Sequence, residues 1–155
     1  MAMKSAIAAT VLACLFAGTA QAEDFTFDAA ANPATTVGGP DMRGNLAMGT
    51  TWTGTSTVTW ADGRKATDKY TCVMVTQPVN DKIFDSHGIC DATGADGTYS
   101  SIWGCQFVSK DGRSTACWGG LVGRSGKFAG RGGTITFAGK DGNGHGTGSW
   151  GDAAK

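Results

Sequence analysis

Alternation between polar and apolar positions is the strongest pattern in the chain, and it is clearest over residues 51–60. Every odd position there is threonine, whereas the even positions hold Trp52, Gly54, Ser56, Val58 and Trp60. Side chains of a β-strand point alternately to its two faces, so this period of two predicts a half-buried strand. We expect its threonine face to meet solvent and its aromatic face to point into the protein.

Turn signals divide the rest of the chain into further strands. Asp-Gly, a leading hairpin-turn signal, occurs at 62–63, 96–97, 111–112 and 141–142. We expect further turns at Gln77–Asp81 and Gly123–Gly126. The strands between these turns are predicted near residues 24–28, 43–60, 65–76, 83–91, 98–108, 113–121, 127–138 and 144–151.

The predicted connections are short, so strands that follow one another in the chain should pair as antiparallel neighbours. No convincing amphipathic helix interrupts them. Eight strands in such a meander can close on themselves, which removes exposed sheet edges. The predicted fold is therefore an all-β, eight-stranded antiparallel up-and-down barrel.

Four cysteines support this register. Cys105 and Cys117 are equidistant from Asp111, and Cys72 and Cys90 are equidistant from the turn at Asp81. Cross-strand opposition brings Cβ atoms within disulfide range. The favoured pairing is therefore Cys72–Cys90 with Cys105–Cys117, and the rival is Cys90–Cys105 with Cys72–Cys117.

The N-terminus reads as a signal peptide. Lys4 precedes an apolar run, and Ala-Gln-Ala at 20–22 is typical of a cleavage site. Cleavage after Ala22 would leave a single barrel domain over 23–155 in the periplasm or outside the cell, where disulfides form. Removal of Lys4 with the signal peptide leaves 12 of the 13 basic residues and all 13 acidic ones. The remaining chain is therefore close to neutral, and no nucleic-acid partner is expected. No later stretch is apolar enough to span a membrane.

Aromatic residues on the predicted strands give the first candidate site. Tyr99 and Trp103 share one strand face, as do Trp52 and Trp60. These four side chains are predicted to point into the lumen, where they either line a cavity for a small apolar molecule or fill a core. Nothing in the sequence points to a cofactor.

Two weaker candidates involve histidine. Asp85 and His87 would share a strand face, where the carboxylate could orient the imidazole for proton transfer, although an exposed strand-end histidine is the simpler interpretation. The stretch 141–152 partly matches a calcium loop, but His145 replaces an oxygen ligand and both flanks read as strands. We therefore predict a hairpin there and no metal site.

The motifs GTYSSIWGCQF, GKFAG, GGTITF and GTGSW in about the last 60 residues resemble the allene oxide cyclase barrel group, which includes the dirigent proteins. That resemblance implies an eight-stranded barrel with an apolar cavity. It implies binding of small hydrophobic molecules and, in some members, cyclisation or radical coupling of the bound substrate.

The favoured function is an exported barrel that binds a small hydrophobic ligand in its lumen without catalysis. One alternative is an isomerase or cyclase of the allene oxide cyclase type, which needs a buried polar group beside its cavity. The other is a barrel-type inhibitor of a secreted enzyme, which should have a filled core and an exposed apolar patch.

Overall fold

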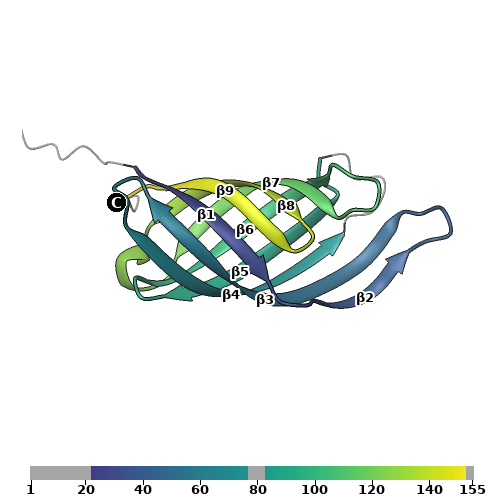
Figure 1. The fold of residues 1–155 in the computed structure, drawn as a ribbon, viewed down its shortest axis with the longest axis horizontal. Coiled ribbons are helices and arrows are strands. Elements are labelled where there is room, and N and C mark those ends of the chain that lie inside the picture. Colours follow the sequence, from purple (N-terminus) through teal and green to yellow (C-terminus); the bar gives the residue numbers. More distant parts are fainter. Residues whose placement is uncertain (1–21, 77–82, 153–155) are drawn as a thin grey trace, which may run out of the picture.

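The computed structural model of the chain describes residues 22–76 and 83–152 (Figure 1). The predicted signal peptide up to residue 21 and the predicted turn at Gln77–Asp81 lie outside the described residues. The elements are β1 (Glu23–Ala31), β2 (Thr35–Pro40), β3 (Leu46–Trp60), β4 (Lys65–Thr76), β5 (Ser86–Gly94), β6 (Gly97–Phe107), β7 (Ser114–Gly123), the 3-10 helix η1 (Gly126–Phe128), β8 (Gly132–Lys140) and β9 (Asn143–Trp150).

Eight of these strands form a closed antiparallel barrel, as the sequence predicts. From β3 to β9, each strand pairs with the next one along the chain. β1 closes the ring because it pairs with β9 along one edge and with β3 along the other. Within the described residues, no helix is long and apolar enough to cross a membrane.

The strand β2 is not predicted from the sequence. β3 pairs with β1 from Gly54 onward, and its first half pairs with β2 up to Thr51. The break between β1 and β2 contains Pro33, which cannot donate a backbone hydrogen bond. The β2–β3 hairpin therefore extends past the barrel as an arm, residues 35–51 (Figure 1, right).

The outer edge of this arm is poorly suited to pairing with another strand. Gly38 adopts a left-handed backbone conformation with φ of 83° in the middle of β2. Pro40 ends the strand and has no N–H to offer. Kinks and prolines of this kind are common on edge strands, where they hinder aggregation.

The connection from β7 to β8 also differs from the prediction. The sequence predicts a turn at Gly123–Gly126 and a strand from residue 127, and this prediction is wrong. β7 runs to Gly123, η1 follows, and β8 begins only at Gly132. Gly126 and Gly130 have φ values of 62° and 72°, and these left-handed positions interrupt the extended run. The chain instead folds back and places the side chain of Phe128 at the end of the lumen.

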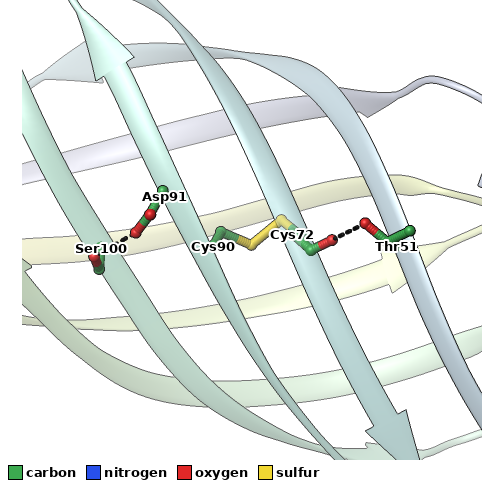
Figure 2. The surroundings of a disulfide bond; sticks show 5 residues. All are labelled: Thr51, Cys72, Cys90, Asp91 and Ser100. Atoms are coloured by element: carbon green, nitrogen blue, oxygen red, sulfur yellow. Dashed lines mark hydrogen bonds between the residues drawn. A yellow bond between two sulfur atoms is a disulfide. The ribbon is translucent and has the colours of Figure 1, made fainter.

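The favoured disulfide pairing is confirmed. Cys72 lies opposite Cys90, and Cys105 lies opposite Cys117, with Cα–Cα separations of 4.0 and 4.1 Å. Figure 2 shows the first bridge between β4 and β5, and Thr51 of β3 donates to the carbonyl oxygen of Cys72 at 3.1 Å. Each bridge therefore fastens two strands that already pair.

Candidate functional site

The four aromatic residues proposed from the sequence lie on the lumen side of their strands. Trp60 and Trp103 are 5% and 6% exposed, while Trp52 and Tyr99 are partly buried against the same core. Val58, between Trp52 and Trp60 in the alternation, is also buried. The period-two pattern therefore places each of these side chains on its correct face.

Ring contacts connect the lumen from the arm end to the opposite end. Neighbouring ring centroids along this series lie between 5.4 and 6.3 Å apart. The series runs through Trp52, Trp103, Phe137, Phe27, Phe25 and Trp60. Of the two interpretations left open by the sequence, these contacts favour a filled core.

Lumen-facing glycines make room for several of these rings. A Cβ on Gly88 would lie 2.2 Å from the indole of Trp103, and a Cβ on Gly148 would lie 2.3 Å from the ring of Phe25. Tyr70 lies equally close to Gly54. Many of the glycines therefore serve packing, because each leaves space on the barrel wall for an aromatic side chain.

Two hollows, of about 610 and 540 Å³, follow β1 on the outside of the barrel. Several threonines line the first, including Thr26, Thr59 and Thr147, and Asp28 and His145 are among the residues that line the second. Both hollows are open to solvent. They do not offer the enclosed apolar site that the favoured function requires.

The barrel end opposite the arm, here called the closed end, is covered by η1 (Figure 1, left). Phe128 is 3% exposed and lies against Trp60, Trp150 and Tyr99. Ion pairs surround it. Glu23 binds Arg64 at 2.8 Å and Arg131 at 3.0 Å, and Asp96 binds Lys127 of η1. The closed end therefore combines an aromatic plug with a charged rim.

A buried carboxylate beneath this plug is the main feature that sequence reasoning missed. Asp68 is 3% exposed and accepts a hydrogen bond from the Tyr99 hydroxyl at 2.9 Å. Burial raises the pKa of Asp68; the Tyr99 hydrogen bond lowers that pKa and the nearby charge of Asp96 raises it. Burial, followed by the charge of Asp68, raises the pKa of Tyr99. The signal was available, because Asp68 has the same strand parity as lumen-facing Cys72.

Asp85 and His87 are not brought together as an acid–base pair. Asp85 precedes β5, and its carboxylate accepts a hydrogen bond from the backbone N–H of Phe107 at 2.6 Å. His87 lies on the outer face of the barrel with its ring 4.8 Å from that of Phe84. Among the described residues, the structure records no hydrogen bond between the two, so they retain separate structural contacts.

The stretch 141–152 forms the turn and last strand of a hairpin. Asp141 has a φ of 52°, which suits the β8–β9 turn, and its carboxylate binds Arg113 at 2.6 Å. His145 is hydrogen-bonded to Asp28 at 2.7 Å. In the described parts of the chain, no cluster of three or more histidine, cysteine or acidic side chains is arranged to hold a metal ion.

A contiguous apolar surface covers the outside of four neighbouring strands. It comprises large hydrophobic side chains that are each 42–52% exposed, and we call it the outer apolar face. Its members are Val73, Val75, Ile89, Ile102, Trp118 and Val122.

Strand register makes this face continuous. Ile89 lies opposite both Val73 and Ile102, and Gly104 lies opposite Trp118. Phe84 packs over Gly104, with its ring 4.7 Å from the indole of Trp118. The face thus has an aliphatic centre and an aromatic flank.

The outer apolar face also reaches the arm. A Cβ on Gly49 would lie 3.6 Å from Val37 and 3.8 Å from Val75, so these two valines flank the same glycine. Val37 is 71% exposed. The opposite strands β1, β8 and β9 differ sharply, because they present the exposed threonines Thr26, Thr136 and Thr147. The barrel therefore has one apolar and one hydroxyl-rich outer side.

Comparisons of the chain with protein-family models, with curated proteins and with solved structures found no match.

Proposed function

We propose that the chain is an exported, non-catalytic binding protein that docks onto a protein partner through its outer apolar face. The observation that carries this proposal is the contiguous exposure of six large apolar side chains around Ile102, on a barrel whose lumen is occupied by its own aromatic rings. Contiguous apolar patches of this kind mark interaction sites in soluble proteins, whereas isolated ones do not. The two disulfides support the export, because such bonds persist in oxidising compartments.

The composition of the face suits protein recognition. Trp118 provides a large anchor at 42% exposure, and tryptophan is enriched among residues that dominate binding energy. Charged residues lie at the rim, where Asp91 binds Arg124 at 3.2 Å. A partner can therefore cover the centre without removing an unpaired charge from water.

The size of the face indicates a reversible contact. At about 4.8 Å between strands and about 3.3 Å per residue, four strands and five residues give roughly 300 Å² in projection. Each side of a stable interface buries about 800 Å². A stable dimer held by this face alone is therefore not expected, and a partner that also reaches Val37 on the arm would gain area.

The other functions depend on the lumen. A carrier of small apolar molecules needs lumen space, and the ring contacts occupy it. An isomerase or cyclase needs a polar group beside such a space, and Asp68 with Tyr99 is the pair that would supply it. The resemblance to allene oxide cyclase barrels remains a prediction. The inhibitor alternative is the one whose two expected features, a filled core and an exposed apolar patch, have counterparts here.

Two charge substitutions at different places on the outer wall test the proposal. Ile102→Glu puts a carboxylate in the centre of the outer apolar face, while Thr57→Glu puts one on the exposed threonine row of β3, opposite Asp28 of β1. Proteins retained by the immobilised wild-type chain from extracts of its producing cells would be identified, purified and titrated against all three chains. We expect Ile102→Glu to weaken binding about 30-fold or more, as for loss of about 2 kcal/mol, and Thr57→Glu to leave it unchanged.

Equal binding of the purified partner to all three chains would contradict the proposal. Analytical ultracentrifugation should show a monomer, and a dimer that Ile102→Glu dissociates would replace the separate partner with a second copy. Wild-type binding to phosphatidylglycerol vesicles that Ile102→Glu abolishes, without any protein partner, would assign the face to lipid instead.

A further inference from the structure

Phe128 fills an aromatic slot at the closed end. Its ring stacks against Trp60 at 6.3 Å and 22° between planes, and against Trp150 at 4.8 Å and 29°. Tyr99 meets the same ring edge-on at 5.0 Å. The occupant is thus a flat ring held by two indoles, and it comes from a connecting segment instead of a barrel strand.

The segment that carries Phe128 is built differently from the strands around it. It lies between Gly123 and Gly132, and both Gly126 and Gly130 have left-handed backbone conformations. Polar contacts hold it to the start of β6. They are the Lys127–Asp96 ion pair, side-chain hydrogen bonds between Ser125 and Thr98, and backbone hydrogen bonds from Lys127 to Asp96 and from Arg124 and Ser125 to Thr98. Glycines on both sides of Phe128 can absorb the backbone change that this segment needs in order to move as a unit.

Two polar groups near the slot, one donor and one acceptor, lack the partners that buried groups usually have. The indole N–H of Trp60 is buried and has no acceptor in the described structure. Asp68, bound to Tyr99 beside the slot, has no ion pair with any described lysine or arginine. An unpaired buried donor and a buried carboxylate without a cation both cost stability, so each needs an explanation.

The two indoles already attract cations. The guanidinium carbon of Arg64 lies 5.4 Å from the ring centre of Trp60, and that of Arg131 lies 5.9 Å from the ring centre of Trp150. Tryptophan is the strongest cation–π partner among the side chains. A cationic aromatic guest would therefore meet two stacking indoles, with the Asp68 carboxylate connected to the slot through Tyr99.

We propose that the slot between Trp60 and Trp150 is a binding site for a planar aromatic amine in its protonated form, and that Phe128 occupies it until η1 moves aside. The ring of the guest takes the place of Phe128. Its ammonium group pairs with Asp68, and an acceptor on the guest, where present, takes the Trp60 N–H. This site is separate from the outer apolar face and does not depend on the function proposed for that face.

Calorimetric titration with tryptamine, and with uncharged tryptophol as its matched probe, tests this site. Wild-type chain should bind tryptamine, and Phe128→Ala should bind it about tenfold more tightly because the competing ring is gone. Tryptophol should bind Phe128→Ala about tenfold more weakly than tryptamine does, since it cannot pair with the carboxylate. Adding Asp68→Asn to Phe128→Ala should abolish that preference.

Phe137→Ala is the matched cavity control, because it removes a ring from the other half of the lumen, against Phe27 and Trp103. It should show no preference for tryptamine. If Phe128→Ala binds both probes equally, or prefers tryptamine with and without Asp68, the slot is only part of the core. If Phe128→Ala does not fold, the indole N–H resonances of Trp60 and Trp150 in wild-type chain decide, and no shift with millimolar tryptamine overturns the proposal.

Discussion

Glycine and aromatic side chains fit together in the lumen at the scale of single residues. Gly88 faces the indole of Trp103 at a distance that excludes even a methyl group. Gly120, on strand β7, faces outward, and a Cβ there would meet only a carbonyl oxygen at 3.7 Å. The same substitution should therefore have opposite consequences at the two positions.

Gly88→Ala is expected to lower the free energy of unfolding by about 1–3 kcal/mol, the usual cost of overpacking a core. Gly120→Ala should leave it unchanged or raise it slightly, because alanine restricts the unfolded chain. Urea unfolding followed by tryptophan fluorescence measures both. Equal effects of the two substitutions would show that the Trp103 ring moves aside freely and that the lumen is loosely packed.

The burial of Asp68 leads to a second testable prediction, on the pH dependence of stability. Burial raises its folded-state pKa above the unfolded value, so the folded state binds the proton more readily. Stability tied to this group is thus greatest in acid and is lost as pH rises through the folded pKa. An asparagine at this position would keep a carbonyl acceptor for Tyr99 without the charge.

Asp68→Asn is therefore expected to raise the melting temperature by a few degrees at pH 7, with the gain shrinking as the pH is lowered toward 4. Circular dichroism melts across this range measure it, with exposed Asp24→Asn as the control. If Asp68→Asn instead lowers the melting temperature, and by as much at pH 7 as at pH 4, the charged carboxylate makes a net favourable contact.

The alternation of polar and apolar positions predicts which side chains point into the lumen wherever it is unbroken. The faces of Trp52, Trp60 and Trp103 follow from parity alone. Asp68 follows from the same rule, but a charged residue at an inward position is rare enough to be overlooked. A strand over 83–91, as the sequence predicts, would put Asp85 on the same face as His87. β5 begins only after Asp85.

Hairpins are the unit at the scale of elements, and two of the eight barrel pairings carry a disulfide. Cys105 and Cys117 are 2% and 4% exposed and close a loop with a sequence separation of 12. A crosslink acts mainly by limiting the unfolded chain, so its contribution depends on loop length more than on local contacts.

Replacing Cys105 and Cys117 together by alanine should lower the free energy of unfolding by about 2–4 kcal/mol and leave the barrel formed. Denaturant unfolding gives the energy, and non-reducing peptide mapping of the wild-type chain gives the connectivity. A linked peptide joining Cys90 to Cys105 would contradict the pairing in the structure. Loss of all tertiary structure in the double variant would mean that the bridge is required for folding.

Elements were predictable where a turn signal separated two alternating runs. β3 and β4 on either side of Asp62-Gly63 and β6 and β7 around Asp111-Gly112 are of this kind. β2 escaped detection because it is short and two of its six residues are glycine. The plug of η1 escaped detection because the pattern around Phe128 looks like a strand, and only the positive φ angles at its glycines reveal the fold-back.

The two outer sides of the barrel appear only at the scale of the whole molecule. Val73, Ile89 and Ile102 lie far apart in the chain and become neighbours through the register of three strands. No single strand displays the outer apolar face, since each contributes one or two members. The lumen could be anticipated from alternation within a strand, but this face requires knowledge of which strands pair and in what register.

The tryptophans report on both sides of the barrel wall, so one measurement can locate binding. Of the five, Trp118 lies on the outer apolar face, and Trp52, Trp60, Trp103 and Trp150 belong to the lumen core or pack against it. Each indole N–H gives one resonance in a nitrogen-15 spectrum, which single substitutions assign.

The most direct test records these five resonances while the protein fraction and then the small-molecule fraction of a producing-cell extract are added. Binding through the outer apolar face predicts that the protein fraction shifts or broadens the Trp118 signal and leaves the four lumen signals in place. A Trp118 signal that responds to neither fraction would contradict the account, and shifts of Trp52 and Trp103 with the small-molecule fraction would then return the binding site to the inside of the barrel.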